Sequence, residues 1–271
     1  WSHTRHHSDT IIVGRDPEIA VPRPTNLFNF ITNFFSLGAF KKYWREMPMH
    51  AVGRFTADEM TFIPESEKSA IIWRARLYLV IYAAVIALAI SMGSILPLMY
   101  IGLPTFYGAW LMVVYGYTQH AGLAENVLDH RLNCRTVYMN PINRFLYMNM
   151  NYHVEHHMFP LVPYLALLKL HELVKADMPK PYNSILEAWR EIIPAVLRQR
   201  REPAWHVRRV IPTPTYPAEA PPVSVAISGA GKKVVDGWIE IGPVGLLNKE
   251  DVLRFDHDHK TYAVYRTADN H

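Results

Sequence analysis

The chain has 271 residues, enough for one or two domains, and half of them are hydrophobic while only 19% are charged. Its formal net charge of +4 is modest, and no Lys/Arg stripe interleaves with aromatic residues, so the composition argues against a nucleic-acid-binding protein. The single cysteine, Cys134, excludes an internal disulfide framework and a cysteine-based zinc or iron–sulfur site within these residues. The chain begins at Trp1 and ends at His271, and we expect it to be a fragment of a longer protein.

The first predicted element is a short helix that carries a histidine cluster, His3-Thr4-Arg5-His6-His7. A second cluster with the same H-x-x-H-H spacing lies far downstream, at His153-Val154-Glu155-His156-His157, and Pro160 is expected to end its helix. On a helix, positions i+3 and i+4 lie on either side of position i, so each cluster points three imidazoles from one face. Imidazole binds iron, zinc and copper, and two such faces would supply six nitrogens, more than one tetrahedral zinc ion uses. The alternative is two unrelated surface clusters.

Residues 27–40 are apolar and aromatic with a few polar interruptions. The segment is too short to span a bilayer, and we expect a helix that lies at the membrane interface. The basic and aromatic run at residues 41–45 is typical of headgroup depth. The alternative is a buried helix of a soluble core.

Two uncharged stretches, residues 77–96 and 97–117, then predict a membrane hairpin. Twenty helical residues measure roughly 30 Å, the thickness of the hydrocarbon core. Pro104 is tolerated there because neighbouring helices can satisfy the freed carbonyl. Basic residues flank the hairpin on both outer sides and are absent from its turn, so the positive-inside rule places both histidine clusters on the cytoplasmic face. A hairpin buried in a soluble core is the alternative. The flanking basic residues are Lys68, Arg74, Arg76, Arg131, Arg135 and Arg144.

His120 follows the second stretch, at the cytoplasmic end of the predicted span, where a further metal ligand could reach the site. Glu125, Asn126 and Asp129 come within the next ten residues, and such groups often orient a metal-bound imidazole by accepting its second N–H. For His130, polar packing, a substrate contact and an orienting role all stay open. The alternatives are a helix cap or interface residue for His120, and ordinary loop solvation for the three residues that follow it.

The C-terminal half changes character twice. Residues 161–200 have a helical pattern of leucine and isoleucine punctuated by proline. Residues 211–231 form a linker rich in Pro, Ala, Gly and Ser. Residues 232–271 contain short strand-like runs at 234–235, 238–241 and 261–265, separated by turns that include residues 248–251. We therefore expect a membrane domain over residues 1–210, then the linker, then the start of a small β-rich domain. The predicted fold is mainly α, a membrane helical hairpin with a cytosolic, histidine-rich helical cap, followed by the beginning of the β-rich domain.

Residues 151–160 (NYHVEHHMFP) resemble the last histidine box of the integral-membrane fatty acid desaturase and hydroxylase superfamily. Residues 3–7 resemble its middle box, and residues 119–133 resemble a segment of a bacterial branch related to the rhizopine-catabolism oxygenase. Three motifs in the right order make the resemblance specific over roughly residues 1–200. It implies a histidine-rich di-iron site and desaturation, hydroxylation or demethylation that uses O₂ and a reductant. The implied iron ligands are His3, His6, His7, His120, His153, His156 and His157.

The chain departs from the family pattern at its start, because the first box, H-x-x-x-H, is expected upstream of Trp1 together with an earlier membrane hairpin. At the other end, residues 237–271 resemble the first strands of a Rieske-type ferredoxin. A Rieske centre needs two cysteines and two histidines, so we expect its [2Fe–2S] motif beyond His271, with His257 and His259 as surface residues. The alternative is a generic β tail. A fused ferredoxin would raise the local concentration of the electron donor.

The function expected from these observations is that of an O₂-dependent di-iron oxidoreductase in a bacterial inner membrane. Its expected cofactors are two iron ions, its electron donor a ferredoxin or ferredoxin reductase, and its substrate a lipid or a small methylated molecule. No nucleic-acid partner is expected. A zinc-dependent membrane hydrolase is one alternative, although no H-E-x-x-H motif occurs and Glu155 is expected to support the ligands or the structure and not to act as a base. A non-redox metal-binding membrane protein is the other, and the candidate ferredoxin argues against it.

Overall fold

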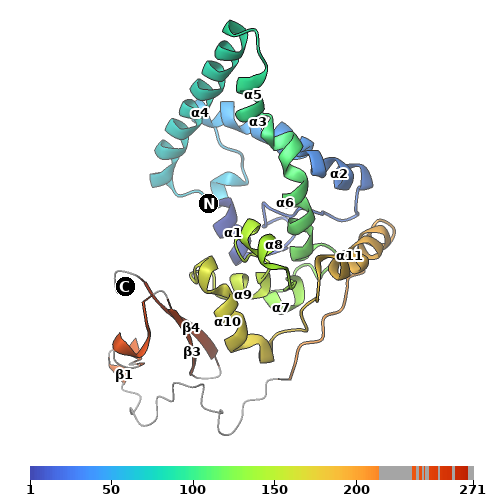
Figure 1. Cartoon of the computed structure of the whole chain (residues 1–271), viewed down its shortest axis with the longest axis vertical. Helices are drawn as coiled ribbons and strands as arrows, with labels where there is room; N and C mark the ends of the chain where they lie inside the picture. The colour runs from blue at the N-terminus through green and yellow to red at the C-terminus, as the bar shows by residue number, and fades with distance from the viewer. Residues whose placement is uncertain are drawn as a thin grey trace. The chain divides into compact units, whose positions relative to one another are not determined.

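The structure is a computed structural model, and it describes the first 213 residues without a gap and parts of the C-terminal region. The predicted linker lies largely outside the described residues, and so do His259 and several other positions of the predicted β-rich domain. The described fold is mainly helical, as predicted, with short strands near the C-terminus (Figure 1). The described ranges are 1–213, 234–235, 238–239, 241, 244–249, 251–257 and 260–267.

Contacts divide the chain into two compact units, each made of two segments. Unit 1 comprises residues 1–129 and 185–208, and unit 2 comprises residues 130–184 and 209–271. The chain thus leaves unit 1 after the predicted membrane stretches and returns to it for one more helix. The division into domains at residue 210 stays a prediction.

Unit 1 is built from helices. They are α1 (Ser2–Ser8), α2 (Leu27–Thr32), the 3₁₀ turn η1 (Asn33–Phe35), α3 (Leu37–Ala51), η2 (Glu59–Thr61), α4 (Glu65–Ser91), α5 (Leu96–Tyr100), α6 (Pro104–His120) and α11 (Ile185–Gln199).

Unit 2 combines short helices with short strands. They are α7 (His130–Asn133), α8 (Pro141–Leu146), α9 (His153–Met158), η3 (Tyr164–Ala166), α10 (Leu167–Val174), η4 (Lys175–Asp177), β1 (Val234–Val235), β2 (Trp238–Ile239), η5 (Val244–Leu246), β3 (Asp251–His257) and β4 (Lys260–Arg266).

Helices α4 and α5–α6 occupy the two stretches predicted to cross a membrane. The segments Glu65–Ser91 and Leu96–His120 are long and apolar enough to do so, and only 11% and 6% of their most apolar windows are buried. A core helix of a soluble protein would be mostly buried, so this exposure disfavours the soluble-core alternative. The second stretch is divided, because α5 ends at Tyr100 and Pro104 begins α6, where its missing N–H costs no helical hydrogen bond. The membrane hairpin itself stays a prediction.

The prediction of one helix over residues 27–40 is wrong, because the chain breaks between η1 and α3. Ser36 has a left-handed backbone with φ of 51°, and α3 then starts afresh at Leu37. Helix α3 continues to Ala51 and takes up the basic and aromatic run that was expected to be only a flank. A single residue with positive φ ends the first helix here, and hydrophobic composition alone does not reveal it.

Helix α2 and turn η1 pack one aromatic face against unit 1 and expose the other. Phe30 stacks on Tyr117 of α6 with ring centroids 4.6 Å apart, and Phe34 lies 6.2 Å from Trp189 of α11. The opposite face leaves large apolar side chains exposed, which is the amphipathic pattern that an interfacial helix requires. These exposed residues are Phe28, Ile31 and Phe35.

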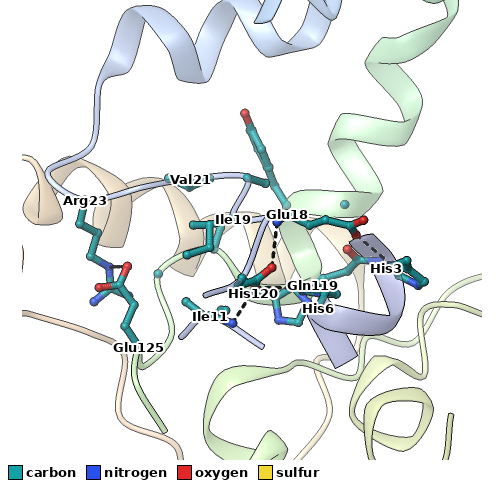
Figure 2. Close-up of a pocket in the computed structure, with 16 residues that line it drawn as sticks. His3, His6, Ile11, Glu18, Ile19, Val21, Arg23, Gln119, His120 and Glu125 are labelled. Carbon is teal, nitrogen blue, oxygen red and sulfur yellow. Dashed lines mark hydrogen bonds and ion pairs between the residues drawn. The ribbon is translucent and has the colours of Figure 1, made fainter. Parts of the chain in front are cut away.

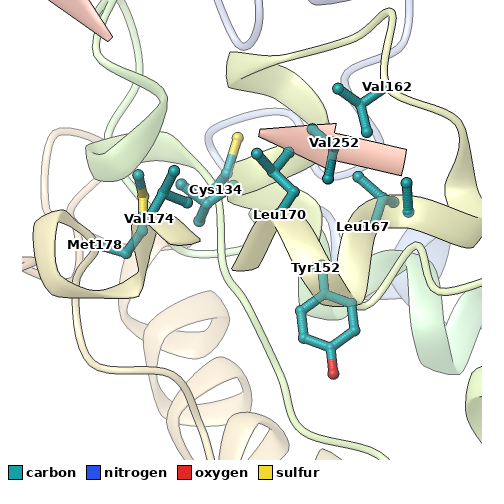
Figure 3. Close-up of a cluster of buried hydrophobic side chains, with 10 residues drawn as sticks. Cys134, Tyr152, Val162, Leu167, Leu170, Val174, Met178 and Val252 are labelled. Carbon is teal, nitrogen blue, oxygen red and sulfur yellow. The ribbon is translucent and has the colours of Figure 1, made fainter. Parts of the chain in front are cut away.

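The core of unit 2 forms where α9 and α10 pack together (Figure 3). Leu167, Leu170 and Val174 repeat at helical spacing and make the buried face of α10 mainly apolar. Val252 of β3 is 1% exposed and joins the same core, which attaches the C-terminal hairpin to α10. The hydrophobic face of α10 therefore positions two elements. It packs on one side against α9, which carries the second histidine cluster, and on the other against the C-terminal hairpin.

Strands β3 and β4 form an antiparallel pair, of which only β4 was predicted. The register runs from Asp251 opposite Arg266 to His257 opposite Lys260. The predicted strand at residues 261–265 lies in β4, whereas β3 begins at Asp251, which was assigned to a turn. Ion pairs of Lys169 with Asp251 and of Arg254 with Asp177 bind the hairpin to α10 and η4. That the hairpin belongs to a ferredoxin stays a prediction.

Candidate metal centre

Helix α1 brings together the first histidine cluster, as the spacing predicted. The rings of His3 and His7 lie 4.7 Å apart, and those of His3 and His6 lie 5.7 Å apart. The Nε2 atoms of His3 and His7 approach to 3.3 Å. An ion pair of 2.7 Å between Arg5 and Asp9, at i and i+4, stabilises the C-terminal turn of this seven-residue helix.

Two carboxylates from the following loop contact the first cluster through Nδ1. His6 Nδ1 lies 2.8 Å from Asp16 Oδ2, and His3 Nδ1 lies 2.9 Å from Glu18 Oε2, an interaction visible in Figure 2. A carboxylate on Nδ1 fixes the tautomer and the ring orientation, and it leaves Nε2 as the metal-binding nitrogen. Asp16 and Glu18 were not singled out from the sequence, because they lie ten and fifteen residues from their partners.

The same contacts keep both carboxylates ionised. Burial on its own would raise the pKa of Asp16, but the hydrogen bond with His6 and those from the backbone amides of Glu18 and Ile11 outweigh it and lower the pKa. The pKa of Glu18 is likewise lowered, since hydrogen bonds with His3 and Ser2 outweigh its burial. The loop thus presents two negative charges behind the imidazoles, which suits a cation in front of them.

His120, the last residue of α6, joins the first cluster. Its ring lies 5.1 Å from that of His6, nearly perpendicular to it. His3, His6 and His120 line a cavity of about 90 Å³, whose opposite walls include Ile19 and Val21 (Figure 2). Unit 1 therefore gathers four imidazoles, two carboxylates and a narrow partly apolar cavity.

Two of the residues predicted to orient imidazoles near His120, Glu125 and Asn126, contact other groups, and the predicted orienting role stays a prediction. Glu125 forms an ion pair of 3.1 Å with Arg23; burial raises the pKa of Glu125, partly offset by that arginine. Asn126, whose φ is 58°, accepts a hydrogen bond of 2.9 Å from the backbone amide of Val13. Asp129 is half-buried at the end of the first segment of unit 1. Asp16 and Glu18 make two of the orienting contacts on the imidazoles of unit 1.

Helix α9 holds the second histidine cluster in unit 2, and it ends at Met158 before Pro160, as predicted. The Nε2 atoms of His153 and His157 are 3.0 Å apart, with ring centroids at 4.4 Å. Both side chains are buried, and each residue is 2% exposed. His156 lies on the same helix with its ring 5.8 Å from His153 and is half-buried.

The two clusters share one geometric feature. In each, the first and last histidine bring their Nε2 atoms together, to 3.3 Å for His3 and His7 and to 3.0 Å for His153 and His157. Two nitrogens that bind one ion at about 2.1 Å lie roughly 3.0 to 3.4 Å apart. The donor set and its spacing therefore fit a transition metal in each unit.

The sequence profile described as "Fatty acid desaturase" matches residues 1–189. The chain belongs to the fatty acid desaturase family. This membership implies O₂-dependent di-iron oxidoreductase chemistry, and the histidine clusters fit it. No curated protein and no solved structure gives a significant match to the chain. The bacterial branch and the ferredoxin stay predictions.

His130 and Cys134 of this desaturase-family chain lie beside the second cluster. They occupy positions i and i+4 at α7, and with His157 they place three ligand atoms within 4.8 Å of one another. The ring of His130 lies 5.3 Å from that of His157. No partner for Cys134 was predicted, because the contact depends on how α7 packs against α9. The cysteine is fully buried, which is the usual setting of an inert structural thiol.

Glu155, between the histidines of the second cluster, is 0% exposed and is held by two side chains. Thr136 Oγ1 donates to Glu155 Oε2 at 2.5 Å, and His171 Nδ1 lies 2.5 Å from Oε1. Tyr138 Oη lies 2.9 Å from His171 Nε2 and completes the chain of contacts. Glu155 was expected to have a supporting role, and its surroundings agree; His171 was missed because nothing in the sequence links it to the motif.

Proposed function

We propose that the two histidine clusters together bind two iron ions. The observation that carries the proposal is the paired Nε2 spacing of 3.3 Å and 3.0 Å in two clusters of identical sequence pattern. When bound, the iron supplies the activation of O₂ for oxidation of an unactivated C–H bond. The proposed ligands are His3, His6, His7, His120, His153, His156 and His157.

The residues around these ligands would set their orientation and the charge of the site. Asp16 and Glu18 hold Nδ1 of His6 and His3, so that Nε2 of each ring is presented. Neutral imidazoles leave the charge of bound cations uncompensated, and the ionised carboxylates of Asp16 and Glu18 offset part of it. The burial of His153 and His157 keeps bulk water away from the nitrogens.

The substrate is proposed to be a lipid or a small methylated molecule. The cavity of about 90 Å³ beside His6 and His120 is narrow, and Ile19 and Val21 give it an apolar side. A space of this size admits a slender alkyl or methyl group. Whether the product is an alkene, an alcohol or a demethylated compound depends on which carbon the cavity presents.

Electrons are proposed to come from a ferredoxin, either fused at the C-terminus or separate, with its reductase. The β3–β4 hairpin is fixed to α10 by the buried Val252 and by the ion pair of Lys169 with Asp251. A fused donor held near its acceptor acts at a high effective concentration. The protein is proposed to lie in a bacterial inner membrane with the histidine clusters on the cytoplasmic face, supported by the two exposed apolar helices.

The test compares O₂-dependent oxidation with hydrolysis. The full-length protein, reconstituted with iron in nanodiscs, is supplied with a chemical reductant and with panels of deuterated lipids and methylated amines. We expect loss of deuterium from one substrate class only when O₂ and reductant are both present, and no turnover by a His157→Ala variant. A product that forms without O₂, or that requires zinc, would instead establish the hydrolase alternative.

A further inference from the structure

Glu155 is a fully buried carboxylate, and removing a carboxylate from water costs free energy. Both of its oxygens are engaged, by Thr136 on one side and His171 on the other, and both contacts measure 2.5 Å. A buried ionic group of this kind is often replaced by apolar residues without loss of stability, so it is weak evidence for a purely stabilising role. Its position between His153 and His156 suggests that its task concerns the helix on which they lie.

We propose that His171 is a positioning residue of the metal centre: it holds the Glu155 carboxylate and thereby the turn of α9 that carries His153, His156 and His157. The inference rests on the proposed function, since it takes these three imidazoles as ligands. His171 touches no reacting atom in this account and acts only through Glu155.

Helix α9 needs such external support because it is short. It has six residues, from His153 to Met158, and isolated helices of this length are unstable in water. The segment preceding α8 holds it from one side, where Thr136 pairs with Tyr152 in a β-bridge and Asn151 Nδ2 donates to Val137 O at 2.8 Å. Helix α10 holds it from the other side, and His171 is the residue of α10 that reaches the helix by a polar contact.

The contact with Tyr138 bears on which nitrogen of His171 carries the proton. The imidazole is 1% exposed, with Nδ1 against the carboxylate of Glu155 and Nε2 against the hydroxyl of Tyr138. If Tyr138 donates to Nε2, then Nδ1 carries the proton and donates to Glu155, which fixes the ring and the carboxylate together. Tyr138 is itself 38% exposed, so this chain of contacts ends at the surface of unit 2.

Two amide substitutions separate this role from packing. In His171→Asn the amide nitrogen lies where Nδ1 lay, so it keeps the contact with Glu155 and loses Tyr138. In His171→Gln the longer side chain places its amide near the Nε2 position, so it keeps Tyr138 and loses Glu155. Packing alone would penalise His171→Asn more than His171→Gln, because Asn is one methylene group smaller and leaves the larger void.

The experiment measures Co²⁺ affinity, the cobalt ligand-field spectrum and the thermal unfolding midpoint of the metal-free protein, for the full-length protein in nanodiscs. We expect His171→Gln to weaken Co²⁺ binding about 10- to 100-fold, as loss of an orienting contact does, and to change the spectrum. His171→Asn should stay near the unsubstituted protein in affinity and spectrum. The metal-free midpoints measure the loss of stability in each variant separately from its effect on metal binding.

Equal Co²⁺ affinity in the two variants, or an unchanged spectrum in His171→Gln, would overturn the positioning role while leaving the proposed function intact. A Tyr138→Phe variant adds a second test, because it removes only the outer contact and should weaken binding less than His171→Gln. If the unsubstituted protein binds neither Co²⁺ nor Fe²⁺, the proposed function fails and this inference fails with it.

Discussion

The two histidine clusters have the same sequence pattern and different supports. In the first, carboxylates from a separate loop contact the imidazoles directly, Asp16 on His6 and Glu18 on His3. In the second, the carboxylate belongs to the motif itself, and Glu155 is held from outside by Thr136 and His171. One cluster is thus oriented ring by ring and the other as a helical turn. A ligand motif thus defines which nitrogens meet but not what keeps them in place.

The clusters also differ in exposure. The side chain of His3 is 61% exposed and that of its partner Glu18 is 32% exposed, whereas His153 and His157 are each 2% exposed. His6 and Asp16 resemble the second cluster, with side chains 6% and 0% exposed. Water can replace a lost contact at an exposed position and cannot do so at a buried one. The expected effects of substitution follow this order.

The largest effect is expected when a buried ligand is removed. His157→Ala should reduce iron affinity by more than the 10- to 100-fold that is typical for an orienting residue, because it removes a nitrogen that lies 3.0 Å from its neighbour. Iron retained after dialysis against a chelator measures this. His206→Ala is the matched control, since His206 lies in unit 1 outside the clusters and should keep its iron. Equal retention by both variants would contradict the assignment.

A smaller loss of iron affinity is expected when Asp16, the buried carboxylate that orients His6, is replaced. Asp16→Asn keeps the size of the side chain and removes the charge that holds His6 Nδ1–H, so iron affinity should fall about 10- to 100-fold. The same chelator competition measures it. Unchanged affinity would show that the first cluster does not depend on its loop.

A still smaller loss of iron affinity is expected when Glu18, the more exposed of the two carboxylates, is replaced. Glu18→Gln removes the partner of His3, but water can take over that contact, and the effect should stay below the lower limit of about 10-fold for orienting residues. A competition titration of both variants in one chelator series resolves the difference. A larger loss of iron affinity for Glu18→Gln than for Asp16→Asn would contradict the expectation that the buried contact matters more.

The smallest effect on iron affinity is expected for a histidine–carboxylate pair that lies outside both clusters. His50 Nε2 lies 2.8 Å from Glu59 Oε1, and Glu59 also accepts from Thr56. Burial would raise the pKa of Glu59, but the hydrogen bonds with Thr56 and the contact with His50 outweigh it and lower the pKa below 4.5. Glu59→Gln should therefore leave iron affinity unchanged, which makes it the control for the carboxylate variants.

The same variant tests the sign of the pH dependence. A carboxylate with a lowered folded-state pKa contributes stability above its unfolded pKa, and this contribution is lost as the pH falls through the folded value. Thermal unfolding midpoints should show the unsubstituted protein more stable than Glu59→Gln at neutral pH, by less than about 1 kcal/mol. The difference should vanish in acid. A difference that grows in acid would contradict the lowered pKa.

The sequence predicted what depends on local spacing. Helical periodicity placed His3, His6 and His7 on one helix, and Pro160 marked the end of α9. The long uncharged stretches likewise became the two exposed apolar helices. These features need only neighbours within one or two turns, so the order of residues suffices to define them.

What could not be predicted depends on packing between distant segments or on one backbone torsion. The contacts of His171 with Glu155 span 16 residues, and those of Tyr138 with His171 span 33. The break at Ser36 follows from a left-handed φ that the apolar sequence around it does not reveal. Strand β3 was missed because its first residue, Asp251, has the composition of a turn.

The central claim is that both clusters serve one iron centre. The most direct measurement is the metal content and the Mössbauer spectrum of the full-length protein, reconstituted anaerobically with ⁵⁷Fe. We predict about two histidine-ligated irons per chain, as the family's di-iron chemistry requires, and the loss of both from a variant of either cluster, His6→Ala or His153→Ala. One tightly held zinc ion, or iron that survives the loss of one whole cluster, would contradict the account.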